Sequence, residues 1–465
     1  MADRGFHGPE IGAHRGFGSA TCVARRRRSG ARPYRQRAAI AYTAGALLVA
    51  LGAALAPARA AEPRVAGFEV TIHASGFDQP TAIEFAPDGR LFVAERGGRI
   101  RIVTDGVVSP DLFGAVEVFT DNENGLLGLA LDPDFAANGR VYVFATVTTT
   151  ESKIIAFVEA RGGAADGDGS GGAATGGAAV DTYVVKDRLP TRGSFHSGGG
   201  LKVGPDGKLY FGIGDTFLPE AAQDLTSLAG KISRINLDGT IPSDNPFVTP
   251  TGAYRATFAL GFRNPFRFTF APDGRLFVLD VGSDGSGRRE EVNLVRAGDN
   301  CGWPLFEGRQ SGLVTDPRFR DPIYDYHEGG AAPVGAVYYT GANFPTRYRD
   351  DLFYLEYVLN RLYHLDLDGD RVVGHSLFVQ AEGGPVDLVQ GPDGALYYCE
   401  IDSGNIRRIA YRASPADTPT DTPADDDVLP IRPPFFGLCG LGALPAALAT
   451  ALTLRLARGA RRPCR

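Results

Sequence analysis

Two short segments of the sequence combine a chemically reactive side chain with residues that favour turns. His196 precedes three glycines in Phe-His-Ser-Gly-Gly-Gly, and Arg263 begins Arg-Asn-Pro with Asn264. An imidazole, whose pKa is ordinarily near 6.5, is suited to remove a hydroxyl proton at neutral pH. The neighbouring glycines would let a flat ligand approach the backbone. The structural alternatives are a turn histidine bonded to a nearby carbonyl and a turn that carries a surface arginine.

Other polar residues stand at comparable places along the chain. Glu123 precedes a Gly-Leu-Leu-Gly turn, and a later segment carries Gln223, Asp224 and Lys231. The region after Arg263 continues through Gly282 and Glu291 to the sequence Asn-Cys-Gly-Trp-Pro. Each segment alone is a weak signal, so its meaning depends on the elements that position it.

A repeated hairpin pattern predicts those elements. Turns of the Pro-Asp-Gly kind, each followed by an alternating apolar run, recur along the body, with a degenerate copy among them. The six copies start at Ala86, Asp132, Gly204, Ala271, Tyr348 and Gly391. Asp-Gly supplies the backbone conformation that tight hairpins need, and the Leu-Phe-Val type runs have strand periodicity. Six hairpins at this spacing favour an all-β, six-bladed β-propeller over a β-sandwich. Catalytic residues would then lie in the loops that meet at the axis.

Charge is unevenly distributed between the leader and the body. The net charge is −6, but residues 1–60 carry ten arginines against Asp3 and Glu10, which leaves −14 for the rest. An acidic body excludes nucleic acid as a partner, because phosphate binding needs a basic surface. No Gly-x-Gly-x-x-Gly opens a helix after a strand, which argues against a nicotinamide cofactor.

The two ends of the chain predict export and tethering. Residues 1–60 read as a signal peptide with a long basic region, and residues 61–412 form the propeller. Residues 413–434 are a Pro/Thr/Asp-rich linker, and residues 435–465 are an apolar stretch followed by an arginine-rich tail. We therefore expect a periplasmic or surface protein that the tail attaches to a membrane, unless the tail is processed.

Two further features leave structural alternatives open. Cys301 and Cys399 are the only cysteines of the body, and they could pair in an oxidising compartment. Residues 161–180 are a low-complexity loop, in which Asp166 to Gly169 lack the spacing of a calcium loop.

Taken in order at propeller spacing, the segments around Glu123, His196, Gln223 and Arg263 resemble the soluble quinoprotein glucose/sorbosone dehydrogenase family. The resemblance covers most of the body, from about Phe68 to Tyr411. It implies oxidation of the C1 hydroxyl of an aldose by hydride transfer to pyrroloquinoline quinone (PQQ), with Ca²⁺ as a second cofactor and an unknown electron acceptor.

The same resemblance implies roles for individual residues. His196 would be the general base, and Arg263 with Asn264 would contact the quinone oxygens. Arg263 would also stabilise negative charge on the reduced cofactor. Backbone carbonyls of Gly282 and Ser283 would bind Ca²⁺, which prefers hard oxygen ligands.

Two departures from the family pattern concern the anionic cofactor. Family enzymes hold its carboxylates with a lysine and an arginine pair, which here fall near Val358 and near Gly384 and Val386; Arg361 could substitute for the lysine. Losing two such contacts would cost several kcal/mol at about 1.5–3 kcal/mol each. Glu123 replaces the glutamine that faces the base. A carboxylate there would repel the cofactor, but it could also serve as a metal ligand or a second acid/base.

These departures keep three functions open. The first is the aldose dehydrogenase. The second is a propeller that binds carbohydrate or protein at the same face with structural Ca²⁺, because the family includes hedgehog-interacting proteins, which also carry a glutamate in the Gly-Leu-Leu-Gly motif. The third is a lactonase-type hydrolase with a metal held by Glu123, Asn264 and Asp280.

Overall fold

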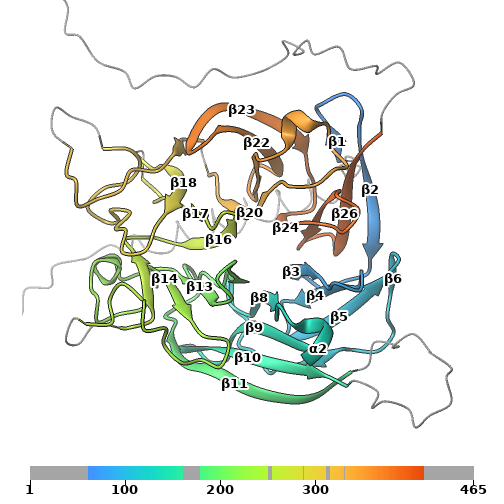
Figure 1. The fold of residues 1–465 in the computed structure, drawn as a ribbon, viewed down its shortest axis with the longest axis horizontal. Helices are drawn as coiled ribbons and strands as arrows, with labels where there is room; N and C mark the ends of the chain where they lie inside the picture. Colours follow the sequence, from blue (N-terminus) through green and yellow to red (C-terminus); the bar gives the residue numbers. More distant parts are fainter. Residues whose placement is uncertain are drawn as a thin grey trace, which may run out of the picture. The chain divides into compact units, whose positions relative to one another are not determined.

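The computed structural model describes residues 61–160, 178–249, 254–285, 287–310, 315–328 and 330–412. In these ranges nearly every regular element is a β-strand, and the strands form six sheets around a common axis (Figure 1). The predicted six-bladed β-propeller is therefore confirmed. The predicted leader, linker and tail lie outside the described residues, as does most of the low-complexity loop. Among the residues described, no helix is long and apolar enough to cross a membrane.

The blades follow one another along the chain, and each begins with the strand next to the axis. Blade one contains β3 (Pro80–Phe85), β4 (Leu91–Glu95), β5 (Arg99–Thr104) and β6 (Val107–Val108), with β7 (Gly114–Ala115) beside β5. Blade two contains β8 (Leu126–Leu131), β9 (Arg140–Thr146), β10 (Glu151–Glu159) and β11 (Ala179–Pro190). Blade three contains β12 (Leu201–Val203), β13 (Leu209–Ile213), β14 (Lys231–Ile235) and β15 (Thr257–Leu260).

The second half of the ring repeats this order. Blade four contains β16 (Pro265–Phe270), β17 (Leu276–Asp280), β18 (Glu290–Val295) and β19 (Tyr324–Tyr326). Blade five contains β20 (Pro333–Tyr338), β21 (Leu352–Glu356), β22 (Arg361–Asp368) and β23 (Arg371–Gln380). Blade six contains β24 (Pro385–Gln390), β25 (Leu396–Glu400) and β26 (Asn405–Tyr411).

All six predicted turns join the first and second strands of a blade. Short helical turns extend two of them, α2 (Phe135–Asn138) in blade two and η2 (Thr346–Tyr348) in blade five. In the Pro-Asp-Gly copies the glycine has a positive φ, for example 89° at Gly89 and 91° at Gly274. Side chains rarely adopt this conformation, which explains why the repeat keeps glycine there.

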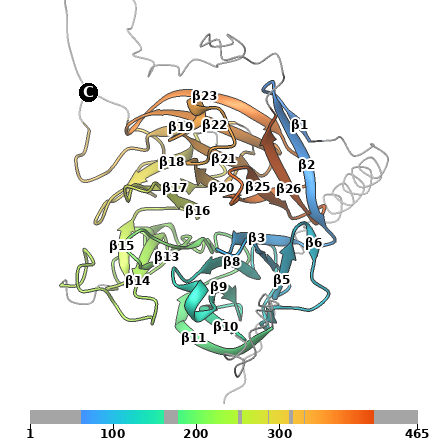
Figure 2. The ribbon, with the colours of Figure 1, turned by 45° about the vertical axis from the view of Figure 1, so that its right-hand side comes forward.

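The N-terminal strands of the body close the ring, a feature that the hairpin repeat does not reveal. β2 (Phe68–Ser75) pairs with β26 as the outermost strand of blade six, with Phe68 opposite Tyr411. β1 (Glu62–Pro63) pairs with β23 at the edge of blade five. Figures 1 and 2 show these N-terminal strands beside the last strands of the chain. Strands from both ends of the body therefore hold the last blade together.

The hydrophobic core consists of six clusters, one between each pair of neighbouring blades. Cys301 lies in the cluster between blades three and four, and Cys399 lies in the cluster between blades six and one. Both thiols are buried and free. The two cysteines do not pair, because different blade interfaces enclose them.

An arginine crosses the axis and fixes the first strands relative to one another. The guanidinium of Arg267 in blade four donates to Asp387 Oδ1 in blade six at 3.2 Å. It also donates to the carbonyl oxygens of Thr81 and Leu127 in blades one and two, at 2.7 and 2.8 Å. Blades one, two, four and six thus share one buried ion pair, which positions the loops at the ends of their inner strands.

Candidate active site

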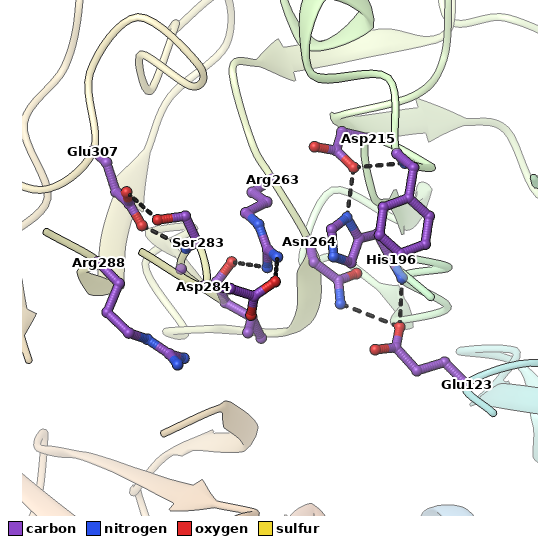
Figure 3. A network of polar contacts seen from close by, with 12 residues as sticks. Glu123, His196, Asp215, Arg263, Asn264, Ser283, Asp284, Arg288 and Glu307 are labelled. Atoms are coloured by element: carbon purple, nitrogen blue, oxygen red, sulfur yellow. Dashed lines mark hydrogen bonds and ion pairs between the residues drawn. The ribbon is translucent and has the colours of Figure 1, made fainter. Parts of the chain in front are cut away.

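The predicted site residues gather on one face of the propeller, which we call the top face. In each blade the first strand begins, and the second strand ends, on this face, because the two strands are antiparallel. Glu123, His196 and Arg263 each stand a few residues before the first strand of blades two, three and four. The side chains of these three loops lie close together, as Figure 3 shows. The structure therefore brings together residues that lie far apart in the sequence, such as Glu123 and Asn264, which are 141 positions apart.

His196 is held in one orientation by a carboxylate. Its Nδ1 atom lies 2.6 Å from Oδ1 of Asp215. Asp215 follows Gly214, which is the first residue after β13. The imidazole is 8% exposed, and its backbone adopts a positive φ of 58°. A carboxylate accepts the proton of Nδ1, so Nε2 carries the free lone pair. The arrangement suits proton abstraction from a ligand hydroxyl.

Asp215 organises more than the imidazole. Its Oδ2 accepts from Trp303 Nε1 at 2.9 Å, and its Oδ1 also accepts the backbone N–H of Phe217 at 3.0 Å. The Phe217 ring stacks on the imidazole with 4.4 Å between the ring centroids. Asp215 is 1% exposed. One buried carboxylate therefore fixes an imidazole, an indole and an aromatic ring together.

Glu123 fastens the His196 loop to blades two and four. Its Oε2 accepts the N–H of His196 at 2.7 Å and that of Ser197 at 3.3 Å, and it also accepts Asn264 Nδ2 at 3.3 Å. Burial raises the pKa of this carboxyl, although the charge of His196 and these donors oppose the shift. Glu123 thus stands beside the base, as predicted, and acts as a hub for the surrounding backbone.

Asp280, at the end of β17, holds the Arg263–Asn264 turn. Its two carboxylate oxygens accept the N–H groups of Arg263 at 2.9 Å and Asn264 at 2.6 Å. Burial raises the pKa of Asp280 to about 7. The Arg263 guanidinium donates to the Val281 carbonyl at 3.2 Å, and its carbon lies 5.9 Å from the Trp303 ring centroid. Trp303 therefore links Arg263 to Asp215 and His196.

Among the described residues, the ion-pair partner of the Arg263 guanidinium is an exposed carboxylate. Arg263 Nη2 lies 3.5 Å from Oδ2 of Asp284, whose side chain is 91% exposed. Such a contact is worth little in water. Because Arg263 itself is 6% exposed, it is a buried cation that remains able to bind an anionic or carbonyl oxygen on the top face.

The predicted metal ligands Gly282 and Ser283 follow β17 on the same face. The N–H of Gly282 donates to Glu290 Oε2 at 2.9 Å, and the N–H and hydroxyl of Ser283 donate to the two oxygens of Glu307 at 2.5 and 2.7 Å. These bonds fix the two peptides. Within the described ranges, no group of three or more His, Cys, Asp or Glu side chains forms a metal site. A site made of backbone carbonyls remains a prediction.

The positions predicted to lack cationic contacts lie in blades five and six. Val358 is 48% exposed. Gly384 has a φ of +68°, and a Cβ atom there would lie 2.6 Å from Asp402 Oδ2. Val386 is buried in the cluster between blades six and one. None of the three supplies a cation.

Arg361, the predicted substitute for the missing lysine, is engaged elsewhere. Its Nη1 lies 2.8 Å from Glu328 Oε2 and 2.7 Å from the Tyr363 hydroxyl. A carboxylate already satisfies its charge, so this arginine is a poor ligand for a second anion.

Sequence reasoning missed the roles of Asp215, Phe217 and Trp303. Asp215 ends the Gly-Ile-Gly-Asp sequence, two residues after the last residue of β13, and Asp280 is the last residue of β17. A carboxylate near the end of the second strand in two neighbouring blades was the signal that could have identified it. The contacts of Phe217 and Trp303 join separate loops, so only the fold reveals them.

The lactonase alternative requires Glu123, Asn264 and Asp280 to converge on a metal. Instead, Glu123 accepts a hydrogen bond from the side-chain amide of Asn264, and Asp280 accepts one from its backbone N–H. The side-chain oxygen of Asn264 accepts the N–H of Gly198 at 3.1 Å. Because these groups bond to one another and to backbone, they do not form an open set of metal ligands, and the geometry does not favour this alternative.

Comparison with known proteins gives a family match over most of the described residues. The family model described as "Glucose / Sorbosone dehydrogenase" matches residues 77–408. Aldose sugar dehydrogenase YliI of Escherichia coli is 27% identical over 350 residues, which are 72% of this chain and 91% of that protein. Quinoprotein glucose dehydrogenase B of Acinetobacter calcoaceticus is 30% identical over 305 residues, covering 58% of this chain and 60% of that protein.

A solved structure shares the fold. The PQQ-bound aldose sugar dehydrogenase of Streptomyces coelicolor superimposes with a TM-score of 0.61 and 26% sequence identity. The match covers 75% of this chain and 99% of that one. The shared part therefore corresponds to the whole of that protein.

Proposed function

Because the chain belongs to the glucose/sorbosone dehydrogenase family, with 77–408 as the matched residues, we propose that it is a PQQ-dependent sugar dehydrogenase. It oxidises the C1 hydroxyl of an aldose. The observation that carries this proposal is the 2.6 Å contact between His196 Nδ1 and Asp215, which leaves Nε2 as a proton acceptor on the top face. A buried arginine and an asparagine lie beside it, where an oxidised cofactor needs polar partners.

The residues present fit the reacting end of the cofactor. Arg263 is a buried cation whose one carboxylate contact is exposed, and it would bind a quinone oxygen. Asn264, held by Asp280 and Glu123, would bind beside it. Glu123 also stands beside this end, and burial raises the pKa of its carboxyl. The carboxylate end lacks the cations expected from Val358, Gly384 and Val386, so we expect weaker binding there.

The chain's own groups divide the work of sugar oxidation. When bound, PQQ would supply the hydride acceptor that side chains lack. Nε2 of His196 takes the proton from the C1 hydroxyl, and Asp215 stabilises the imidazolium that results. Arg263 offers positive charge where negative charge builds. Trp303 and Phe217 hold these groups in place and exclude water from one side.

Ca²⁺ and the cellular location belong to the same proposal. The fixed peptides of Gly282 and Ser283 would present carbonyl oxygens to Ca²⁺, which prefers such ligands. The sequences of residues 1–60 and 435–465 support export to the periplasm or cell surface and attachment to a membrane through the tail. The reduced enzyme passes its electrons to an acceptor that the chain does not identify.

One observation supports a second candidate function. Blades five and six offer no free cation at Val358, Gly384 or Arg361. The same top face could therefore bind a neutral carbohydrate or a protein without the cofactor. The experiment below distinguishes the two functions.

The test uses the purified full chain with PQQ and Ca²⁺. We expect uptake of the cofactor by absorbance titration and aldose-dependent reduction of a redox dye. The variant His196→Ala should still take up the cofactor but lose about 10²–10⁴-fold in turnover. His73→Ala, on the outer strand β2, is the matched control. Absence of cofactor uptake would contradict the enzymatic function and favour the binding propeller. Full turnover by His196→Ala would refute the assignment of the base.

A further inference from the structure

Two partly exposed aromatic rings flank the proposed base, and neither has been given a contact with the substrate so far. Phe217 is 51% exposed and Phe195 is 41% exposed, although both stand in loops of the top face. Their ring centroids are 6.1 Å apart, and the rings are nearly perpendicular. We call these two rings the aromatic platform. Exposed phenylalanines that contact each other from separate loops are typical of binding surfaces.

The backbone holds Phe217 in an unfavourable conformation. Thr216 and Phe217 have φ values of 53° and 60°, a region that bulky residues rarely enter. The N–H of Phe217 is fixed by Asp215 Oδ1 at 3.0 Å, and the N–H of Leu218 donates to the Asp215 carbonyl at 2.9 Å. A half-exposed side chain gains little by burial here. Backbone strain of this kind concentrates at functional sites, where surrounding contacts maintain it.

The platform is close to the reacting atom. The Phe217 ring lies 4.4 Å from the imidazole of His196, with an angle of 30° between the planes. A hydroxyl that gives its proton to Nε2 must come within about 3 Å of that atom. The ring that bears this hydroxyl would then be within contact distance of the exposed Phe217 ring.

We propose that Phe217, with Phe195, stacks against the C–H face of a cyclic aldose and sets its orientation toward His196. This inference rests on the proposed function. The face of an aromatic ring carries partial negative charge and attracts weakly positive C–H bonds, whereas the sugar hydroxyls at the ring edge stay free for polar contacts. Because Asp215 fixes both His196 and Phe217, substrate orientation and proton abstraction depend on the same carboxylate.

The test compares Phe217→Ala and Phe217→Trp with Tyr183→Ala. Tyr183 is 37% exposed on β11, an outer strand, so its loss removes a similar exposed ring away from the base. With the cofactor-loaded full chain, Phe217→Ala should raise KM for aldoses about tenfold or more and change kcat less, because a ring contact contributes mainly to binding. Phe217→Trp should restore KM. Tyr183→Ala should leave both constants unchanged.

A second readout does not depend on turnover. Trp303 is the single tryptophan of the chain, and its Nε1 bonds to Asp215. Aldose titration should change its fluorescence in the native chain at a lower concentration than in Phe217→Ala.

Unchanged KM and unchanged fluorescence titration in Phe217→Ala would overturn the platform even if the enzyme is active. If the native chain has no turnover, the proposed function fails. A sugar-dependent fluorescence change that Phe217→Ala weakens would then still support the platform, and no change in the native chain would refute it.

Discussion

The top face has two unlike halves. On the side of blades two to four, each polar group of the site bonds to a partner from another loop, as His196 does with Asp215 and Asn264 with Glu123. On the side of blades five and six, the apolar side chain of Val358 is exposed, and Arg361 forms an ion pair with Glu328. The first half is built to hold reacting groups in place. The second retains the architecture without the cations that would grip an anionic cofactor.

This difference indicates that one fold can hold a connected set of polar residues in some loops while neighbouring loops lack one. The blades share strand order and inner turns, but the loops between them are independent in sequence. Variants in either half can therefore test whether the two halves differ in function.

The largest effect is expected from the carboxylate behind the base. Asp215→Asn keeps the size of the side chain but removes the charge that stabilises the imidazolium, so turnover should fall about 10²–10³-fold. Asp402→Asn is the same change in blade six. It should leave turnover within about twofold, since no described contact joins Asp402 to His196 or Asp215. Dye-linked kinetics measure both. Equal losses in the two variants would remove the distinction between the halves.

An added cation on the side of blades five and six should strengthen the binding of an anionic cofactor. Val358→Lys places an ammonium group at a position that is 48% exposed, so the fold should tolerate it. One charged contact to a carboxylate should tighten PQQ binding about tenfold. Calorimetric titration compares it with Val358→Leu. If Val358→Lys and Val358→Leu bind PQQ equally, the cofactor's carboxylates do not lie near this position.

The smallest effect concerns the acidic residues buried beneath the first half. Burial raises the pKa of Glu291 to about 8, compared with an ordinary value of 4.5. A carboxyl whose pKa is raised in the folded state contributes stability below its unfolded pKa, and this contribution is lost as pH rises through the folded pKa. The melting temperature should therefore fall between pH 5 and about 8.

Glu291→Gln should reduce that fall by a few degrees, because the amide oxygen still accepts the N–H of Gly308 and no longer ionises. Scanning calorimetry across this pH range measures the slope. A steeper fall in the variant than in the native chain would contradict the assignment.

The sequence predicted the fold well because glycine turns and apolar alternation are local signals. Gly89 and its counterparts need a positive φ, and this need is visible in the Pro-Asp-Gly repeat. The closure by β2 was not visible, since that strand pairs with a partner more than 300 residues away. Long-range pairing leaves no local pattern that identifies its partner.

Local signals also predicted part of the candidate site. His196, Glu123, Arg263 and Asn264 stand in glycine-rich or proline-containing turns, and the structure brings them together. The contacts of Asp215 with Trp303 and of Phe217 with His196 join loops that are separate in sequence. The fold of blade three brings Phe217 to His196, and the packing of blades three and four brings Trp303 to Asp215.

The central claim is that the His196 side of the top face removes hydrogen from C1 of an aldose. Turnover of glucose carrying deuterium at C1, compared with glucose carrying deuterium at C2, tests it most directly. The account predicts that deuterium at C1 slows dye reduction by the cofactor-loaded chain and that deuterium at C2 does not. Turnover that is insensitive to deuterium at C1 but slowed by deuterium at C2 would contradict it.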